Sequence, residues 1–384
     1  MVVAQQVLKW TSLSRAISEM KMAATFIDQL VFGSTEIQET RSIELSIERR
    51  GREMAPFISR GAEAYLVGGD SSEFFQITPP NIRIKRPLHV GQLLNDRAPG
   101  STIFINGSTR SSIVRRKIAE ALGRLEFMIR NSEEFLACQA INGLISYNPT
   151  DAGAFSGLVT HRRDFDTFTV DFSGLGYQTR TLTSTNTWNT AAASYTGDPA
   201  VDFLNVKRDI SDEVGLAPTH AIFGRTAAEY FLKLQKVKDL LDVRRLMAGG
   251  IDITNQFNEQ GALYMGNFAG VQCWEYQHTM LHFQPIKISG YLESNAGSTS
   301  NPIFPTLIPD DAVIFLSLLP SAEFRKYYGA IEDLPQLQGR SAAGRRFAKS
   351  WVQEDPPVRY LLAESHPLPF LRRAGAVCRL EPLT

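Results

Sequence analysis

The chain has 384 residues, 43% of them hydrophobic, and its 40 Lys and Arg balance its 40 Asp and Glu. This length is enough for a sizeable core, since a ~300-residue chain buries roughly 75% of its unfolded surface. Proteins that condense nucleic acid by neutralising phosphates carry a basic excess, so the zero formal charge argues against that class. It also removes the self-repulsion that opposes dense self-association.

The cysteine pattern and the hydropathy argue against several further classes of protein. Cys138, Cys273 and Cys378 are far apart and form no C-x-x-C spacing, so we expect neither a disulfide framework nor a thiolate metal site. No apolar run reaches the ~18 residues that a membrane helix needs, and no secretory leader is recognisable. We therefore expect a protein that stays in a reducing cytoplasm until lysis and has no membrane partner.

The first 90 residues predict a short helix followed by a long two-stranded arm. Residues 23–30 have helical spacing of their apolar side chains. Residues 41–90 look extended, because apolar and polar residues alternate over 43–48 with a period of two, and 68–70 form a turn signal. An isolated hairpin is not stable in water, so the arm requires a partner surface.

Residues 111–146 predict one long amphipathic helix. Its apolar stripe begins with the predicted core residues Val114, Ile118, Leu122 and Leu125. About 35 residues at 1.5 Å each would make a rod on the order of 50 Å long, far above the mean of roughly 12 residues for globular helices. Such a helix is typical of a structural girder.

The rest of the chain mixes strands and helices without a strict βαβ rhythm, which predicts the α+β class. We expect two or three strands in 156–189, a helix at 201–210, a strand at 219–223, a helix after Gly224, strands at 262–276 and 279–289, and a buried strand at 312–319.

No motif in the sequence supports catalysis or a cofactor. Gly174 and Gly176 lack the third glycine of a dinucleotide fingerprint and are better interpreted as a hairpin turn. His278 and His282 could share a cation on a helix, but their neighbours favour a strand, in which they would stand roughly 13 Å apart. We therefore predict no metal site, no cofactor, no catalytic residue and no enzymatic activity.

Several stretches, in the same order over about 50–370, resemble the lambda-type major capsid proteins, the phage capsid protein E family. The matching stretches are Met54–Ser59, Gly68–Phe74, Pro79–Lys85, Phe223–Gly224 with Lys236–Arg245, Tyr328–Asp333, Arg346–Pro356 and Glu364–Pro369.

The resemblance implies the Hong Kong 97 phage-type capsid fold and a shell subunit that forms hexamers and pentamers. The implied parts are an N-terminal arm (1–45), an extended loop or E-loop (46–90), a peripheral domain (91–194) with spine helix 111–146, an axial domain (195–340) and a return to the peripheral domain (341–384). Tyr65, Leu66, Phe74 and Phe75 are the expected E-loop contacts with a neighbouring subunit.

Further implied partners are a scaffolding protein, a portal, a decoration protein and packaged double-stranded DNA held without sequence-specific binding. The implied location is the phage head, assembled in the bacterial cytoplasm. Two alternatives stay open at this point. One is an encapsulin-like cellular shell of the same fold, and the other is an α+β hydrolase that acts as a monomer.

Overall fold

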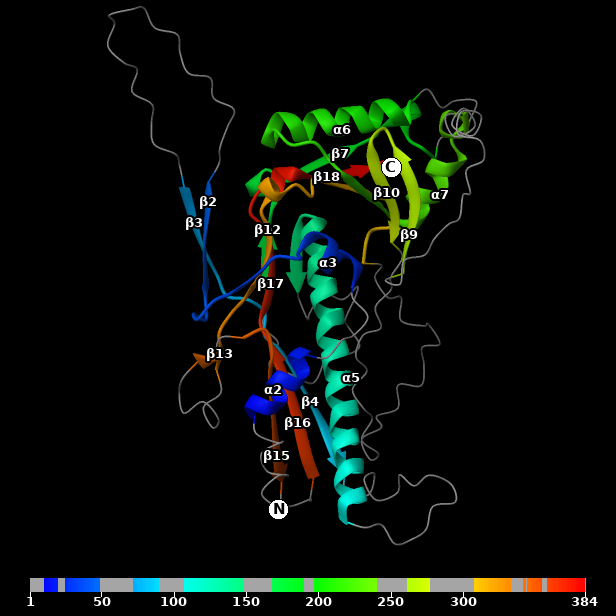
Figure 1. The fold of residues 1–384 in the computed structure, drawn as a ribbon. Coiled ribbons are helices and arrows are strands. Elements are labelled where there is room, and N and C mark those ends of the chain that lie inside the picture. The colour runs from blue at the N-terminus through cyan, green and yellow to red at the C-terminus, as the bar shows by residue number, and fades with distance from the viewer. Residues whose placement is uncertain are drawn as a thin grey trace, which may run out of the picture. The chain divides into compact units, whose positions relative to one another are not determined.

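The computed structural model describes eleven segments of the chain, whose elements Figure 1 labels. They are residues 10–19, 25–48, 72–89, 107–147, 168–189, 197–239, 261–276, 307–332, 341–342, 344–353 and 358–383.

The chain divides into two compact units, each assembled from separate stretches of sequence. Unit 1 comprises residues 1–47, 72–136 and 325–370, and unit 2 comprises 48–71, 137–324 and 371–384. Each unit combines helices with sheets in no regular βαβ order. The α+β class expected from the sequence is therefore confirmed.

The predicted long helix is confirmed as α5, which runs unbroken for 35 residues from Gly107 to Ile141 (Figure 1). Its end lies five residues before the predicted limit of 146. The chain turns at Gly143, whose φ is +92°, a conformation that favours glycine. Leu144–Tyr147 then forms strand β5, which pairs antiparallel with β6 (Phe168–Asp171).

In unit 1, α5 packs on an antiparallel sheet with the order β15 (Phe347–Gln353), β16 (Val358–Ser365) and β4 (Ile82–His89). Helix α2 (Trp10–Glu19) joins the same core. That core consists of Leu13, Ile17, Leu88, Ile118, Ala121, Leu122, Leu125, Ile129, Ala348, Leu361 and Ala363, with Ile82 and Ile84 at its edge.

Smaller elements complete unit 1. Of the arm expected over 41–90, strands β2 (Ile43–Glu48) and β3 (Ser72–Ile77) pair with each other. The end of that range was predicted wrongly, because residues 82–89 form β4, which pairs with β16 in the sheet of unit 1. Helix α3 (Phe26–Val31) precedes β1 (Thr35–Ile37). Strand β1 pairs in parallel with β12 (Phe324–Tyr328), which also adjoins β17 (Pro367–Leu371). A two-stranded sheet joins β13 (Ile331–Glu332) and β14 (Ser341–Ala342).

Unit 2 is built on a six-stranded mixed sheet. Its strand order is β7 (Gln178–Thr181), β18 (Val377–Glu381), β11 (Val313–Leu316), β8 (His220–Phe223), β10 (Val271–Tyr276) and β9 (Ala262–Phe268). Helices α6 (Pro199–Val214) and α7 (Arg225–Lys233) contribute buried residues to its core. Short 3-10 helices occur at Ser173–Leu175, Ser184–Asn186, Pro320–Ala322 and Ala374–Ala376.

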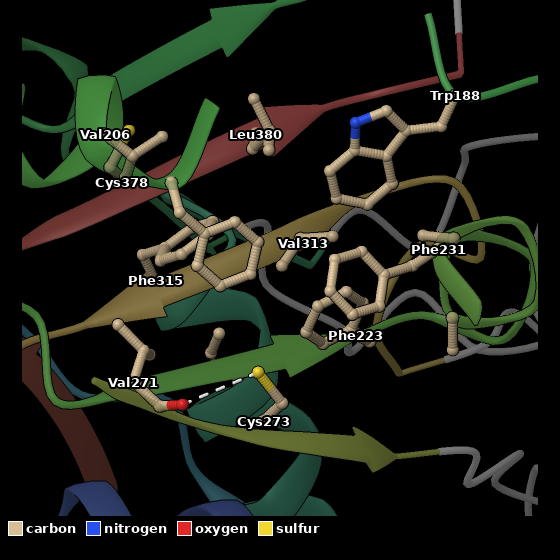
Figure 2. Packing of buried hydrophobic residues seen from close by; sticks show 14 of the residues in the cluster. Trp188, Val206, Phe223, Phe231, Val271, Cys273, Val313, Phe315, Cys378 and Leu380 are labelled. Atoms are coloured by element: carbon tan, nitrogen blue, oxygen red, sulfur yellow. Dashed lines mark hydrogen bonds between the residues drawn. The ribbon is translucent and has the colours of Figure 1, made fainter. Parts of the chain in front are cut away.

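The core of unit 2 is rich in aromatic rings (Figure 2). Phe203 of α6 meets Phe315 of β11 edge to face, with ring centroids 4.8 Å apart. The ring of Trp188 lies 5.3 Å from that of Phe231 on α7. Such pairs contribute roughly 0.5–1.5 kcal/mol beyond the burial of their area. They fix both helices against the sheet.

Helix α6 has strong end signals. The Asp198 carboxylate accepts a hydrogen bond from the backbone N–H of Ala200, at 2.9 Å, and Pro199 occupies the first turn. Gly215 ends the helix with φ at +75°. These residues are the preferred types at these positions, so the local sequence sets the limits of the helix.

The prediction of a hairpin turn at Gly174 and Gly176 was wrong. Strand β6 pairs with β5, whereas β7 pairs in parallel with β18, so the two flanking strands lie in different sheets. A 3-10 turn and Gly176, with φ at +91°, redirect the chain between the sheets. The strand predicted at 279–289 lies outside the described residues.

Candidate functional site: a buried charge network beside the long helix

Seven acidic and basic side chains gather where α5 meets the N-terminal segment of unit 1. Helix α5 contributes Glu126, Arg130, Glu133 and Glu134, helix α3 contributes Asp28, β12 contributes Lys326, and Arg346 precedes β15. Glu126 and Glu133 are seven residues apart, about two helical turns, so they share one face of α5.

Glu134 holds the beginning of α3. One carboxylate oxygen accepts from the backbone N–H of Ile27 at 2.9 Å, and the other accepts from that of Asp28 at 2.8 Å. The first N–H groups of a helix lack partners within the helix. A fully buried glutamate on α5 therefore stabilises the start of α3.

Lys326 joins α3 to α5 through two carboxylates. Its Nζ donates to both oxygens of Asp28, at 2.7 and 2.6 Å, and lies 3.6 Å from Oε2 of Glu133. The Lys326 and Glu133 side chains are only 6% and 3% exposed. At this degree of burial each charge needs its partner, because a buried charge left unpaired destabilises the folded protein.

Arg346 forms the other half of the network. Its Nη1 and Nη2 donate to the two oxygens of Glu133, at 2.7 and 2.9 Å, and its Nε donates to Glu126 at 2.8 Å. The hydroxyl of Tyr328 also donates to Glu133, at 3.0 Å. Arg130 closes the group by donating to Glu126 at 2.8 Å. Bidentate pairs of this kind are among the strongest hydrogen bonds in proteins.

The electrostatics of the network distinguish its acids. Burial by itself would raise the pKa of Glu133, but Lys326 and Arg346 outweigh burial and hold that pKa below its ordinary value. Burial raises the pKa of Asp28, and Lys326 only partly opposes it. Asp28 shares the positive charge of Lys326 with Glu133, and the negative charge of Glu133 raises the pKa of Asp28 further. Burial and Glu133 raise the pKa of Tyr328 to about 12.

The network holds separate segments of the chain together. Its carboxylates are occupied by hydrogen bonds from arginine, lysine, tyrosine and backbone. Within the segments that the structure describes, no three His, Cys, Asp or Glu side chains are grouped as metal ligands would be. None of the helices in those segments is long and apolar enough to cross a membrane.

The residues predicted from the sequence lie elsewhere. Tyr65 and Leu66, like His278 and His282, fall outside the described residues. Phe74 and Phe75 lie in β3, but the description does not extend to their side chains, nor to that of Val114 in α5. Ile118, Leu122 and Leu125 are buried together on the sheet. All three cysteines are buried, and none of them forms a disulfide.

Sequence reasoning missed the charge network, although one signal was available. Glu126, Glu133 and Glu134 interrupt the apolar face of the predicted helix, and buried acids are rare unless paired. Their bases could not be identified in advance. Lys326 is 298 residues from Asp28 along the chain, and Arg346 is 213 residues from Glu133.

Comparison with known proteins places this architecture in a family. The sequence profile described as phage major capsid protein E matches residues 9–381. A search of curated protein sequences finds no match. Among solved structures, a prophage protein of Escherichia coli CFT073, described as a capsid protein, is 11% identical, with a TM-score of 0.59, and the alignment covers 98% of this chain and 99% of that chain.

A phage-related protein of Bordetella bronchiseptica RB50 is 15% identical with a TM-score of 0.47, covering 98% of this chain and 97% of its own. The fold assignment rests on the Escherichia coli structure, and the family assignment rests on the profile match. The chain has the Hong Kong 97 phage-type fold expected from the sequence, and it belongs to the phage major capsid protein E family.

Proposed function

We propose that this chain is the head subunit of a tailed double-stranded DNA phage and self-associates into the hexamers and pentamers of an icosahedral shell around the genome. The observation that carries the proposal is the family match over residues 9–381. It favours a phage head over an encapsulin-like cellular shell and a structural role over a monomeric hydrolase. The protein would assemble in the bacterial cytoplasm and reside in the virion.

The expected domains fit this function. The N-terminal arm (1–45) and E-loop (46–90) would overlap neighbouring subunits, the peripheral domain (91–194 and 341–384) would contain α5, and the axial domain (195–340) would surround the capsomer axes. The compact units group 137–194 and 371–384 with the sheet of unit 2. Strand β18 lies within that sheet, so its residues would move with the axial domain.

Partners beyond the chain itself belong to the same proposal. A scaffolding protein, a portal and a decoration protein would contact the shell, and packaged DNA would lie inside without sequence-specific binding. The zero formal charge supports weak adhesion to DNA, since phosphate binding depends on basic residues.

Negative-stain electron microscopy tests the proposal. We would image the purified protein expressed alone and with the scaffolding protein of its own phage. Regular polyhedral particles, tens of nanometres wide, are expected. Monomers that persist even with the scaffolding protein would contradict the proposed function.

A second experiment tests the E-loop contacts. Phe74→Asp places a charge where we expect an apolar anchor for a neighbouring subunit, so subunits should stay soluble and fail to close shells. Gln76→Asp is the matched control, because Gln76 is exposed on the same strand. Normal particles from the Phe74 variant would refute the assignment.

A further inference from the structure

His366 lies between β16 and β17, and each of its two ring nitrogens faces an oxygen. Nδ1 is 2.9 Å from the carbonyl oxygen of Ala330, and Nε2 is 3.2 Å from Oε1 of Glu364. A carbonyl oxygen and an ionised carboxylate oxygen can only accept hydrogen bonds. A neutral imidazole carries one N–H, so it can donate to only one of these oxygens. The ring needs a second N–H to satisfy both.

The surroundings of Glu364 favour an ionised carboxylate that depends on His366. The Glu364 side chain is only 2% exposed. Ala363 packs in the core beside α5, so Glu364 faces the other side of the sheet, next to Phe347 of β15. Its Oε2 lies 3.3 Å from Nε of the half-exposed Arg83 on β4, but accepts no hydrogen bond among the described residues. The hydrogen bond to Glu364 therefore comes from His366.

The other charged groups around this pair are already bound. Nη1 of Arg346 donates to the hydroxyl of Ser365 at 2.9 Å, but the same guanidinium is paired with Glu126 and Glu133. The hydroxyl of Tyr328, on β12, donates to Glu133 as well. These groups do not supply a further donor to Glu364.

His366 also joins segments that are distant in the sequence. Its carbonyl oxygen accepts from the backbone N–H of Gly329 at 3.0 Å, so its ring and its backbone both hold the segment between β12 and β13. The N–H of Ala330 in turn donates to the carbonyl oxygen of Thr40 at 3.1 Å. Loss of the ring contacts would therefore loosen a junction of three chain segments.

We propose that His366 is an imidazolium that donates from both ring nitrogens, and that its pairing with Glu364 is a pH-sensitive joint between the β16–β17 junction and the segment linking β12 to β13. The stabilisation is present at low pH, because the folded subunit holds the extra proton, and it is lost as the pair releases that proton at higher pH. The inference concerns the single subunit, so it goes beyond the proposed function and does not depend on shell formation.

Nitrogen NMR of unassembled wild-type subunits with ¹⁵N-labelled histidine tests the protonation state. An isolated histidine is mostly neutral at about pH 7. His366 should nevertheless show two protonated ring nitrogens at that pH. Its signals are assigned by their absence in His366→Gln and by their change in Glu364→Gln. A His366 ring with a single N–H would overturn the inference.

Hydrogen exchange of the Gly329 amide tests the joint. After correction for the intrinsic pH dependence of exchange, its protection in wild-type subunits should fall at least about tenfold between about pH 6 and about pH 9, since a hydrogen bond between charged groups is lost. The amide of Leu361, in the central strand β16, is the internal control and should keep its protection. A Gly329 amide equally protected at both pH values would refute the proposal.

Glu364→Gln is the matched variant. Its side-chain amide can donate to Nε2 of a neutral ring, while Nδ1–H still donates to Ala330. Both ring nitrogens are then satisfied without an extra proton, so protection of the Gly329 amide should change by less than about twofold over the same pH range. A tenfold fall in this variant would contradict the assignment to the pair. If the variant does not fold, the two wild-type measurements decide, and neither of them bears on the shell.

Discussion

Replacing Lys326 with methionine probes the charge network most directly. Lys326 is 6% exposed and is the base that Asp28 and Glu133 share. Methionine preserves most of the side-chain volume but leaves two buried carboxylates without that base. Breaking a buried ion pair by removing one partner costs about 3–5 kcal/mol, so Lys326→Met should lower the free energy of unfolding of the subunit by that amount.

The assay combines urea denaturation of unassembled subunits with hydrogen exchange. Denaturation gives the global loss, and exchange of the amides in α3 and β1 reports detachment of the N-terminal segment. Lys233→Met on α7 is the control, because Lys233 is 65% exposed and lies 3.8 Å from Glu229. An exposed pair contributes ~1 kcal/mol at most.

A double variant separates pairing from packing. Asp28→Asn combined with Lys326→Met should cost less than the sum of the two single changes, because neutralising Asp28 removes the charge that the first change left unpaired. If Lys326→Met costs no more than Lys233→Met, or leaves exchange in α3 unchanged, the network does not anchor the N-terminal segment and the reasoning fails.

Three further predictions concern titration, backbone fit and core packing. The pKa of Glu133 is lower in the folded protein than its unfolded value of 4.5. The ionised carboxylate therefore stabilises the fold above pH 4.5, and this contribution is lost as pH falls through the folded pKa. Glu133→Gln should flatten the acid limb of a curve of unfolding free energy against pH, and an unchanged acid limb would refute this. Gly224→Ala would bring a Cβ within 2.0 Å of the carbonyl oxygen of Pro309, whereas a Cβ at Gly174 meets nothing within 4 Å. Thermal denaturation should therefore show a clearly lower melting temperature for Gly224→Ala and none for Gly174→Ala. Equal melting temperatures would show that the backbone at 309–310 moves to make room. Leu125→Ala should lower the free energy of unfolding by about 2–5 kcal/mol, and Phe127→Ala should change it by no more than about 0.5 kcal/mol, because Leu125 is 2% exposed and Phe127 is 49% exposed. Comparable losses for the two variants in urea denaturation would contradict the orientation of α5.

The sequence by itself determined the elements whose signal is local. The apolar stripe predicted α5, because the helical period repeats along one continuous segment. Alternation over 43–48 predicted β2, and the structure buries Ile43 and Leu45 while exposing Glu44. The apolar pattern at 201–210 predicted α6, and the structure shows that this helix runs from Pro199 to Val214. These patterns, with the ordered family stretches, were enough for the fold class and the family.

Only the tertiary structure decided which distant residues meet. The helical period of α5 contains no information about Arg346, and nothing near Asp28 indicates Lys326, 298 residues away. The turn at Gly174 had the composition of a hairpin, yet its flanking strands join different sheets, because β7 finds a partner in β18 near the C-terminal end of the sequence. Side-chain periodicity shows which face of an element is buried, whereas the partner on that face depends on how separate segments pack.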